Sequence, residues 1–128
     1  MAEGSGGGGE VLVKDAVGAY GERVAAAHLV ASGMVVLERN WRCAAGEVDI
    51  VARDGDVLVF VEVKTRTSVR FGSPLEAVTP VKAARLRRLA AAWLHERSLH
   101  VPEMRIDLIG VLRPRRGPAQ VEHVRGVA

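Results

Sequence analysis

Two short segments, Gly46-Glu47-Val48-Asp49-Ile50 and Val61-Glu62-Val63-Lys64, decide the fold and place charged side chains among apolar, mostly β-branched ones. Between them lies Arg53-Asp54-Gly55-Asp56, and Asp-Gly between two apolar runs is a strong signal for a tight β-hairpin. We therefore expect two antiparallel strands, over residues 46–52 and 57–65, joined by this turn. Acids and a lysine are unusual within such strands, so they need an explanation.

Around this hairpin, periodicity and capping residues predict the other elements. Apolar and small residues recur at helical spacing up to Gly33, a typical C-terminal cap, and Thr79-Pro80 supplies an N-cap and a first helical residue. The expected elements are a helix over 14–32, strands over 34–41, 46–52 and 57–65, a loop over 66–78, a helix over 79–97, a strand over 104–112 and an edge strand over 120–125. The order α-β-β-β-α-β predicts an α/β protein with a central mixed sheet flanked by helices.

Length and composition favour one ordinary globular domain. The chain has 128 residues, 48% of them hydrophobic and 26% charged. We expect a disordered Gly-rich tail over 1–12 and a single domain over 13–128. One cysteine excludes an internal disulfide, and no apolar stretch is long enough for a membrane helix, so we expect a cytoplasmic protein without a membrane partner. The net charge of +3 permits nucleic-acid binding without requiring it.

The parity of the hairpin brings the charged residues together. A strand directs successive side chains to opposite faces, so Glu62 and Lys64 share a face. A two-residue turn at Asp54-Gly55 would place Glu47 opposite Glu62 and Asp49 diagonal to it, about 7–8 Å away at Cα. Moving the turn one residue along the chain keeps this parity, whereas a three-residue loop without a bulge would break it. The spacing therefore predicts that these acids and Lys64 gather at one end of the hairpin.

Carboxylates so close together repel one another unless a positive charge lies between them. Lys64 supplies one charge, and a bound cation is the simplest source of the rest. Oxygen ligands favour Mg²⁺ or Mn²⁺, which can polarise a phosphoryl oxygen and lower the pKa of a bound water. The alternative is a set of cross-strand salt bridges, with Glu47 or Glu62 paired to Lys64. The apolar residues elsewhere on both faces of the strand favour the metal site, because charges on a partly buried face are unfavourable unless they are used.

The first predicted helix carries one further acid. One stripe of residues at helical spacing is Ala16, Tyr20, Val24, Ala27 and Val30. A second stripe consists of Gly18, Glu22, Ala25 and Leu29. Small residues on the second stripe would let the helix approach another element closely, and Glu22 stands out among them. It either points into a site or pairs with a neighbouring arginine.

These residues resemble known motifs. Asp49 followed by Glu62-x-Lys64 is similar to the PD-(D/E)xK signature of restriction-endonuclease-like nucleases, with Gly46-Glu47-Val48-Asp49 in place of the Pro-Asp pair. The chain more closely resembles the bacterial YraN-like family, which is similar to archaeal Holliday junction resolvases. The matching segments, within about residues 14–112, are Gly18-x-x-Gly21-Glu22-x-x-Ala25, Arg39-Asn40-Trp41-Arg42, Gly46 to Ile50, Val59 to Arg66, Phe71-Gly72 and Arg105-Ile106-Asp107.

The resemblance implies a restriction-endonuclease-like fold and a set of roles. Asp49 and Glu62 would bind the metal, together with the backbone carbonyl of Val63. Lys64 would lie beside the attacking water, and Glu22 would point at the metal from the first helix. Glu47 belongs to the YraN-like pattern as a supporting residue without an assigned role.

Several basic residues are candidates for nucleic-acid contacts. Arg66 would contact the scissile phosphate or cap the acidic cluster. Lys82 and Arg85 would bind phosphate or form a solvated helix face, and Arg42 could extend the same surface. Trp41 is a candidate for stacking on bases.

Together these features predict a Mg²⁺- or Mn²⁺-dependent endonuclease that acts on DNA, with branched or single-stranded DNA as candidate substrates in repair or recombination. The resemblance to junction resolvases also implies a homodimer, because a junction offers two equivalent strands. One alternative is a nucleic-acid-binding module on a nuclease fold without the chemistry. Another is a scaffold protein whose acidic cluster is structural.

Overall fold

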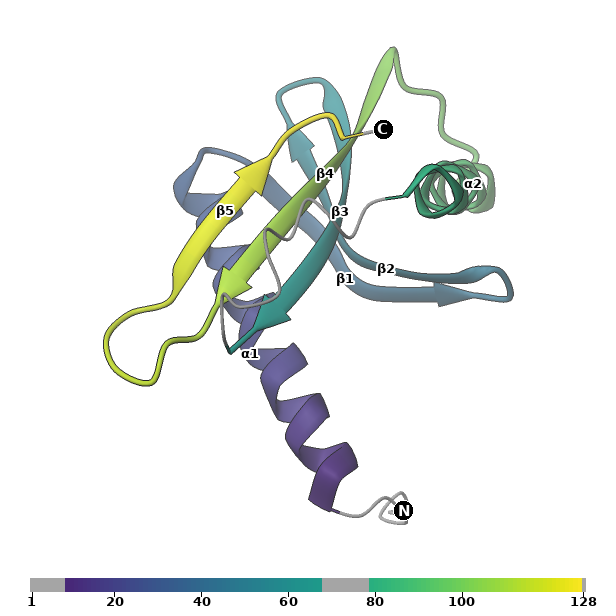
Figure 1. Ribbon diagram of the computed structural model, residues 1–128. Coiled ribbons are helices and arrows are strands. Elements are labelled where there is room, and N and C mark those ends of the chain that lie inside the picture. The colour runs from purple at the N-terminus through teal and green to yellow at the C-terminus, as the bar shows by residue number, and fades with distance from the viewer. Residues whose placement is uncertain (1–8, 68–78, 128) are drawn as a thin grey trace.

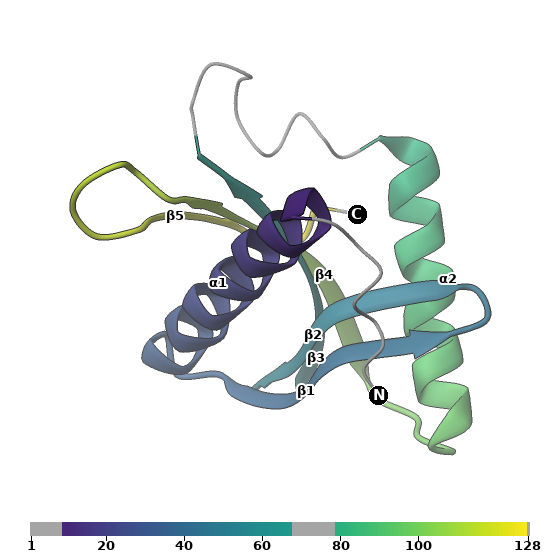
Figure 2. The same cartoon turned by 90° about the horizontal axis from the view of Figure 1, so that it is seen from below.

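The computed structural model describes residues 9–67 and 79–127, and the side chains of 16–67 and 79–127. In this part of the chain a five-stranded sheet has the order β1-β2-β3-β4-β5, with α1 on one face and α2 on the other (Figures 1 and 2). The elements are α1 (Gly9–Ala31), β1 (Val35–Cys43), β2 (Gly46–Asp54), β3 (Val57–Arg66), α2 (Pro80–Glu96), β4 (Glu103–Leu112) and β5 (Gln120–Val124). The predicted α/β class, with a mixed sheet flanked by helices, is confirmed and is consistent with a restriction-endonuclease-like fold.

The central hairpin is closed by the later of the two turns considered. Asp54 pairs with Val57, so Gly55 and Asp56 form the turn, and Gly55 has the left-handed φ of 62° that favours glycine. The antiparallel β2–β3 pairing then runs to Ile50 and Val61. Strands β3 and β4 are parallel, whereas β1–β2 and β4–β5 are antiparallel, which makes the sheet mixed.

Two apolar cores lie on opposite faces of this sheet because side chains alternate along each strand. The core beneath α2 contains Trp41, Val48, Val51, Leu58, Phe60, Leu86, Leu89, Ala90, Trp93 and Ile106. The core beneath α1 contains Ala25, Leu29, Met34, Ile50, Ala52, Val59, Val61, Ile109 and Val111. The β1–β2 hairpin reaches outward beside α2 (Figures 1 and 2).

The stripe of small residues is the one that α1 buries. Ala25 and Leu29 are fully buried, whereas Val30 on the first stripe is 59% exposed. Of the two glycines in this stretch of α1, Gly21 packs against the sheet and Gly18 does not. A Cβ atom on Gly21 would lie 1.8 Å from the Thr65 hydroxyl oxygen, so only glycine allows α1 to pack this close to β3.

The end of α2 is joined to β1 by a polar cluster around two tryptophans. Arg97 lies 4.1 Å from the Trp93 ring centre and donates to Glu38, which also accepts the indole N–H of Trp93 at 2.9 Å. Trp41 is only 7% exposed and packs in the core beneath α2. The hypothesis that Trp41 stacks on bases is therefore wrong, because its ring is covered by this packing.

The predicted boundaries agree closely with the structure. Thr79 is the N-cap of α2, since its hydroxyl accepts the Lys82 N–H at 3.1 Å. Helix α1 begins at Gly9, earlier than the predicted residue 14. Residues 1–8 and most of the predicted loop, including Phe71-Gly72, lie outside the described residues. No helix in the described part of the chain is long and apolar enough to cross a membrane.

Substituting Gly21 tests the close helix–strand contact. Gly21→Ala should lower the free energy of unfolding by about 1–3 kcal/mol, because the new methyl group overlaps the Thr65 side chain. Gly18→Ala is the matched control. Its Cβ would meet nothing within 4 Å, so it should leave stability unchanged or raise it by about 0.5–1 kcal/mol.

The measurement is urea unfolding of both variants, and of Gly21→Ala combined with Thr65→Gly. The combined variant should lose less stability than the sum of its two single changes, because removing the Thr65 side chain makes room for the methyl group. Equal effects at Gly18 and Gly21 would contradict the contact.

Candidate metal centre

The centre lies where β2 separates from β3. The recorded pairing of these strands ends at Ile50 and Val61, and the next residue of β2 towards its N-terminus is Asp49. Its carboxylate accepts the backbone N–H of Val63 at 2.8 Å. This hydrogen bond replaces a strand–strand contact and fixes one Asp49 oxygen beside β3.

Three acids meet at this point. Glu22 of α1 and Glu47 and Asp49 of β2 each offer a carboxylate oxygen, and these oxygens lie within 4.8 Å of one another. Oxygens bound to one divalent cation at 2.0–2.6 Å span about this distance. Glu22 reaches the group because Gly21, its neighbour, packs against Thr65 of β3. The arrangement therefore fits a hard divalent cation, with ligands from a helix and a strand.

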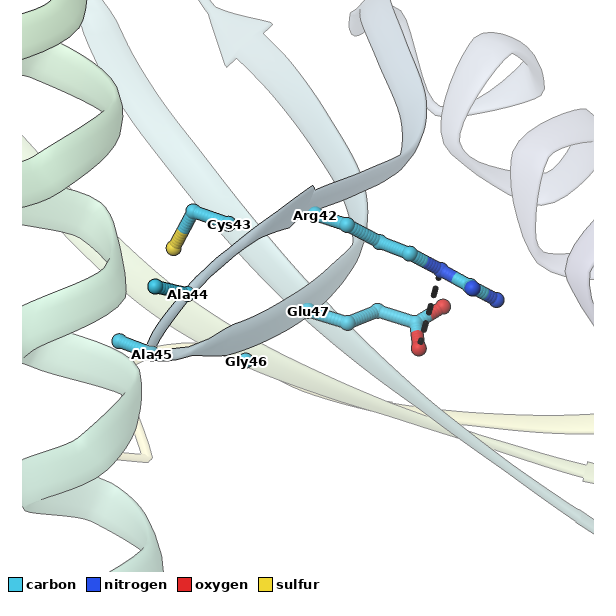
Figure 3. Close-up of a pocket in the computed structure, with 6 residues that line it drawn as sticks. All are labelled: Arg42, Cys43, Ala44, Ala45, Gly46 and Glu47. Atoms are coloured by element: carbon cyan, nitrogen blue, oxygen red, sulfur yellow. Dashed lines mark ion pairs between the residues drawn. The ribbon is translucent and has the colours of Figure 1, made fainter.

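Glu47 also contacts a base on the facing strand. Its carboxylate lies 3.8 Å from Arg42 Nε, and Figure 3 shows both side chains extending to the same side of the β1–β2 hairpin. Cys43 points to the other side (Figure 3). Because Arg42 is largely exposed, this ion pair contributes little to stability and can rearrange when a ligand binds.

The surroundings of Asp49 disfavour its negative charge. Burial is the main reason that the pKa of Asp49 rises from its ordinary 3.8 to about 7; the hydrogen bond from the Val63 N–H opposes this rise, and the charges of Glu62, Glu22 and Glu47 add to it. Between these two pH values the folded chain keeps a proton that the unfolded chain loses. Stability without metal therefore falls as the pH rises through this interval.

Glu62 is placed near this group but faces another residue. Its carboxylate forms an ion pair with Lys82 in the first turn of α2, and it is not one of the three converging acids. Its charge nevertheless acts on Asp49. The structure thus brings together Glu22, Glu47 and Asp49, whereas the sequence led us to expect Glu62 as a ligand and Glu47 only as support.

The other predicted site residues surround this centre. Val63 contributes its N–H to Asp49. Lys64 is partly buried on β3, and the described part of the chain offers it no hydrogen bond or ion pair. Arg66 ends β3, where its carbonyl accepts the Arg113 N–H at 2.8 Å. Arg85 is exposed on α2 and lines a pocket of about 310 Å³ with Thr79, Val81 and Lys82.

A second polar network, around Asp107, was not predicted from the sequence. Asp107 of β4 is fully buried and accepts two hydrogen bonds from Arg105, at 2.8 and 3.1 Å, and the Gly126 N–H at 3.0 Å. His123 Nε2 lies 2.8 Å from the same carboxylate, and His123 Nδ1 lies 3.1 Å from His28 Nε2. The network connects β4, β5 and α1.

The charge of Asp107 sets the direction of these hydrogen bonds. Burial alone would raise the pKa of Asp107, but the hydrogen bonds from Arg105, His123 and Gly126 hold it below its usual range. With Asp107 ionised, His123 must donate from Nε2, so a neutral His123 accepts from His28 at Nδ1. The signal available in the sequence was the i, i+2 pair Arg105 and Asp107, whereas the two histidines share no motif.

This network predicts a pH-dependent stability. Burial and the positive charges of His123 and Arg125 lower the pKa of His28 below its ordinary 6.5. The unfolded chain therefore binds a proton more readily than the folded chain, and stability present above about pH 6.5 is lost as the pH falls. Between pH 7.5 and 5.5, His28→Gln should therefore lose less stability than wild type.

Urea unfolding at several pH values measures this difference. The control is His95→Gln, because His95 is exposed near the end of α2 and should keep the wild-type pH dependence. A wild-type pH profile for His28→Gln would rule out this role for the His28–His123 contact.

Comparison with known proteins identifies the family. Residues 21–111 match the model of the family described as uncharacterised protein family UPF0102. A UPF0102 protein of Nocardioides sp. is 64% identical over 90% of this chain and 93% of its own. Another, from Beutenbergia cavernae, is 66% identical over 89% and 97%, and one from Streptomyces coelicolor is 57% identical over the whole of both chains. The chain belongs to the UPF0102 family, which is the YraN-like family that the sequence motifs resemble.

Proposed function

We propose that this protein is a metal-dependent endonuclease that hydrolyses phosphodiester bonds of DNA. The observation that supports the proposal most strongly is the meeting of the Glu22, Glu47 and Asp49 oxygens within 4.8 Å. Together with the raised pKa of Asp49, it describes a group of acids that a divalent cation would stabilise. Oxygen ligands of this kind favour Mg²⁺ or Mn²⁺.

Asp49 is the central residue of the proposed site. Its hydrogen bond to the Val63 N–H orients the carboxylate and leaves further lone pairs for an ion. Glu22 and Glu47 complete the group, and Glu62 is a further ligand if its carboxylate turns from Lys82. A bound Mg²⁺ or Mn²⁺ would polarise a phosphoryl oxygen and lower the pKa of a coordinated water.

The basic residues have separate roles in this proposal. Lys64 follows Glu62 by two positions on β3, and its ammonium group would orient the attacking water and stabilise negative charge that develops on the phosphoryl oxygens. Arg42, Arg66, Lys82 and Arg85 would bind backbone phosphates. Branched or single-stranded DNA in repair or recombination is the proposed substrate class, and it rests on the resemblance to junction resolvases. A homodimer would then place two centres on the two equivalent strands of a junction.

A cleavage assay tests the proposal. Purified protein is incubated with single-stranded, duplex, flap and four-way-junction DNA in Mg²⁺, Mn²⁺ or EDTA. Wild type should cut at least one substrate only with metal, and Asp49→Asn and Lys64→Met should each reduce the rate by about a hundredfold or more, because each removes a group that acts on the transition state.

The matched control is Asp56→Asn, which removes an exposed acid from the hairpin turn and should cut like wild type. Cutting that persists in EDTA, or that is equal in wild type and Asp49→Asn, would contradict the proposed chemistry.

One observation favours a second candidate, a nucleic-acid-binding module that does not cut. Glu62 is neutralised by Lys82 and does not face the other acids, as expected if no ion binds between them. This candidate predicts DNA binding without cleavage, and binding that survives Glu62→Ala.

A further inference from the structure

Lys82 is held in an unusual electrostatic position. Its backbone N–H donates to the hydroxyl oxygen of the N-cap Thr79 in the first turn of α2, and its ammonium group forms an ion pair with Glu62. Both side chains are mostly buried, with 23% of Lys82 and 14% of Glu62 exposed. The pair is therefore less screened by water and salt than an ordinary surface ion pair.

The helix itself disfavours a positive charge at this place. Backbone N–H groups make the N-terminus of a helix positive, and an acid is the residue type that stabilises it. The first turn of α2 contains no acid, and Lys82 adds a further positive charge. Among the residues that the structure describes, Glu62 of β3 is the acid that pairs with Lys82, so the position of the Lys82 ammonium group depends on Glu62 remaining available.

Glu62 also belongs to the electrostatic surroundings of Asp49. Its negative charge acts on Asp49 together with those of Glu22 and Glu47. Lys82 therefore neutralises an acid whose charge acts on the Asp49 group in the protein without metal. A divalent cation bound at Asp49 would attract the same Glu62 carboxylate and repel the Lys82 ammonium, so the two cations compete for one acid.

We propose that Lys82 is the internal counter-ion of Glu62 in the metal-free protein, and that a divalent cation displaces it from Glu62 on binding at the Asp49 group. This inference rests on the metal site of the proposed function and adds a step to it. Lys82 then changes from a partner in an internal ion pair to a cation that can pair with another anion. It is a positioning residue for Glu62 and does not touch the ion.

Manganese titration of the whole chain, by calorimetry or by electron paramagnetic resonance of free Mn²⁺, tests the exchange without DNA. Lys82→Met should tighten Mn²⁺ binding by about three- to tenfold, because the ion no longer competes with the ammonium group. Lys82→Arg keeps the charge and should bind Mn²⁺ like wild type. Arg88→Met removes one exposed charge from the same helix and should change the affinity by less than about twofold.

A stability measurement gives an independent readout. In EDTA, Lys82→Met should be less stable than wild type, because it leaves the Glu62 carboxylate without a counter-ion. Saturating Mn²⁺ should reduce this difference, because tighter Mn²⁺ binding stabilises the folded variant more than it stabilises wild type. Converted to an equilibrium constant, the reduction should equal the factor by which Lys82→Met tightens Mn²⁺ binding. If Lys82→Met does not fold in EDTA, refolding on addition of Mn²⁺ supports the exchange, and failure to refold contradicts it.

The outcomes separate this inference from the proposed nuclease activity. If wild type binds Mn²⁺ but Lys82→Met binds it no more tightly than Arg88→Met, the exchange is wrong while the metal site stands. If Mn²⁺ binds with the predicted exchange but no DNA is cut, the nuclease proposal fails and the exchange stands. If wild type does not bind Mn²⁺, both are wrong.

Discussion

The hydrogen bond from the Val63 N–H to the Asp49 carboxylate, 2.8 Å long, holds an acid at the point where β2 leaves β3. Everything proposed for this centre depends on that placement. Asp49 is partly removed from water and lies among the charges of three glutamates, so its ionised form is unfavourable without a nearby cation. The fold thus holds several carboxylates close together, and a proton or a divalent ion would reduce their mutual repulsion. Lys82 already reduces part of this repulsion by its ion pair with Glu62.

The position of α1 is the second constraint, because this helix carries Glu22 to the centre. Gly21 allows a close approach to Thr65, and at the far end of the helix His28 contacts His123. These two contacts, with the apolar packing between them, fix the helix along the sheet. The buried network around Asp107 therefore supports the centre only through α1, since it joins the helix that carries Glu22 to β4 and β5.

Much of the fold was predictable because local rules and the global arrangement agree. The Asp-Gly turn and the pairing of its strands as far as Ile50 and Val61 follow local rules. Parity alone does not place Glu47 and Asp49, because Val48 and Val51 pack in the same core and the alternation of side chains is therefore broken between them. The pairing of Glu62 with Lys82 was not predictable, because it depends on how α2 lies across the sheet. The Asp107 network joins three elements distant in sequence, and neither of its histidines has a motif that marks it. The buried stripe of α1 contains glycine and alanine, whose role becomes evident only beside Thr65.

The most direct test of the central claim is a nuclear magnetic resonance titration of the Asp49 side-chain carboxyl carbon, with and without Mg²⁺. Without metal, Asp49 should titrate with a pKa of about 7, far above its ordinary 3.8. Saturating Mg²⁺ should lower that pKa towards or below its ordinary value, because the ion stabilises the carboxylate. An Asp49 that titrates near 3.8 and does not respond to Mg²⁺ would contradict the account.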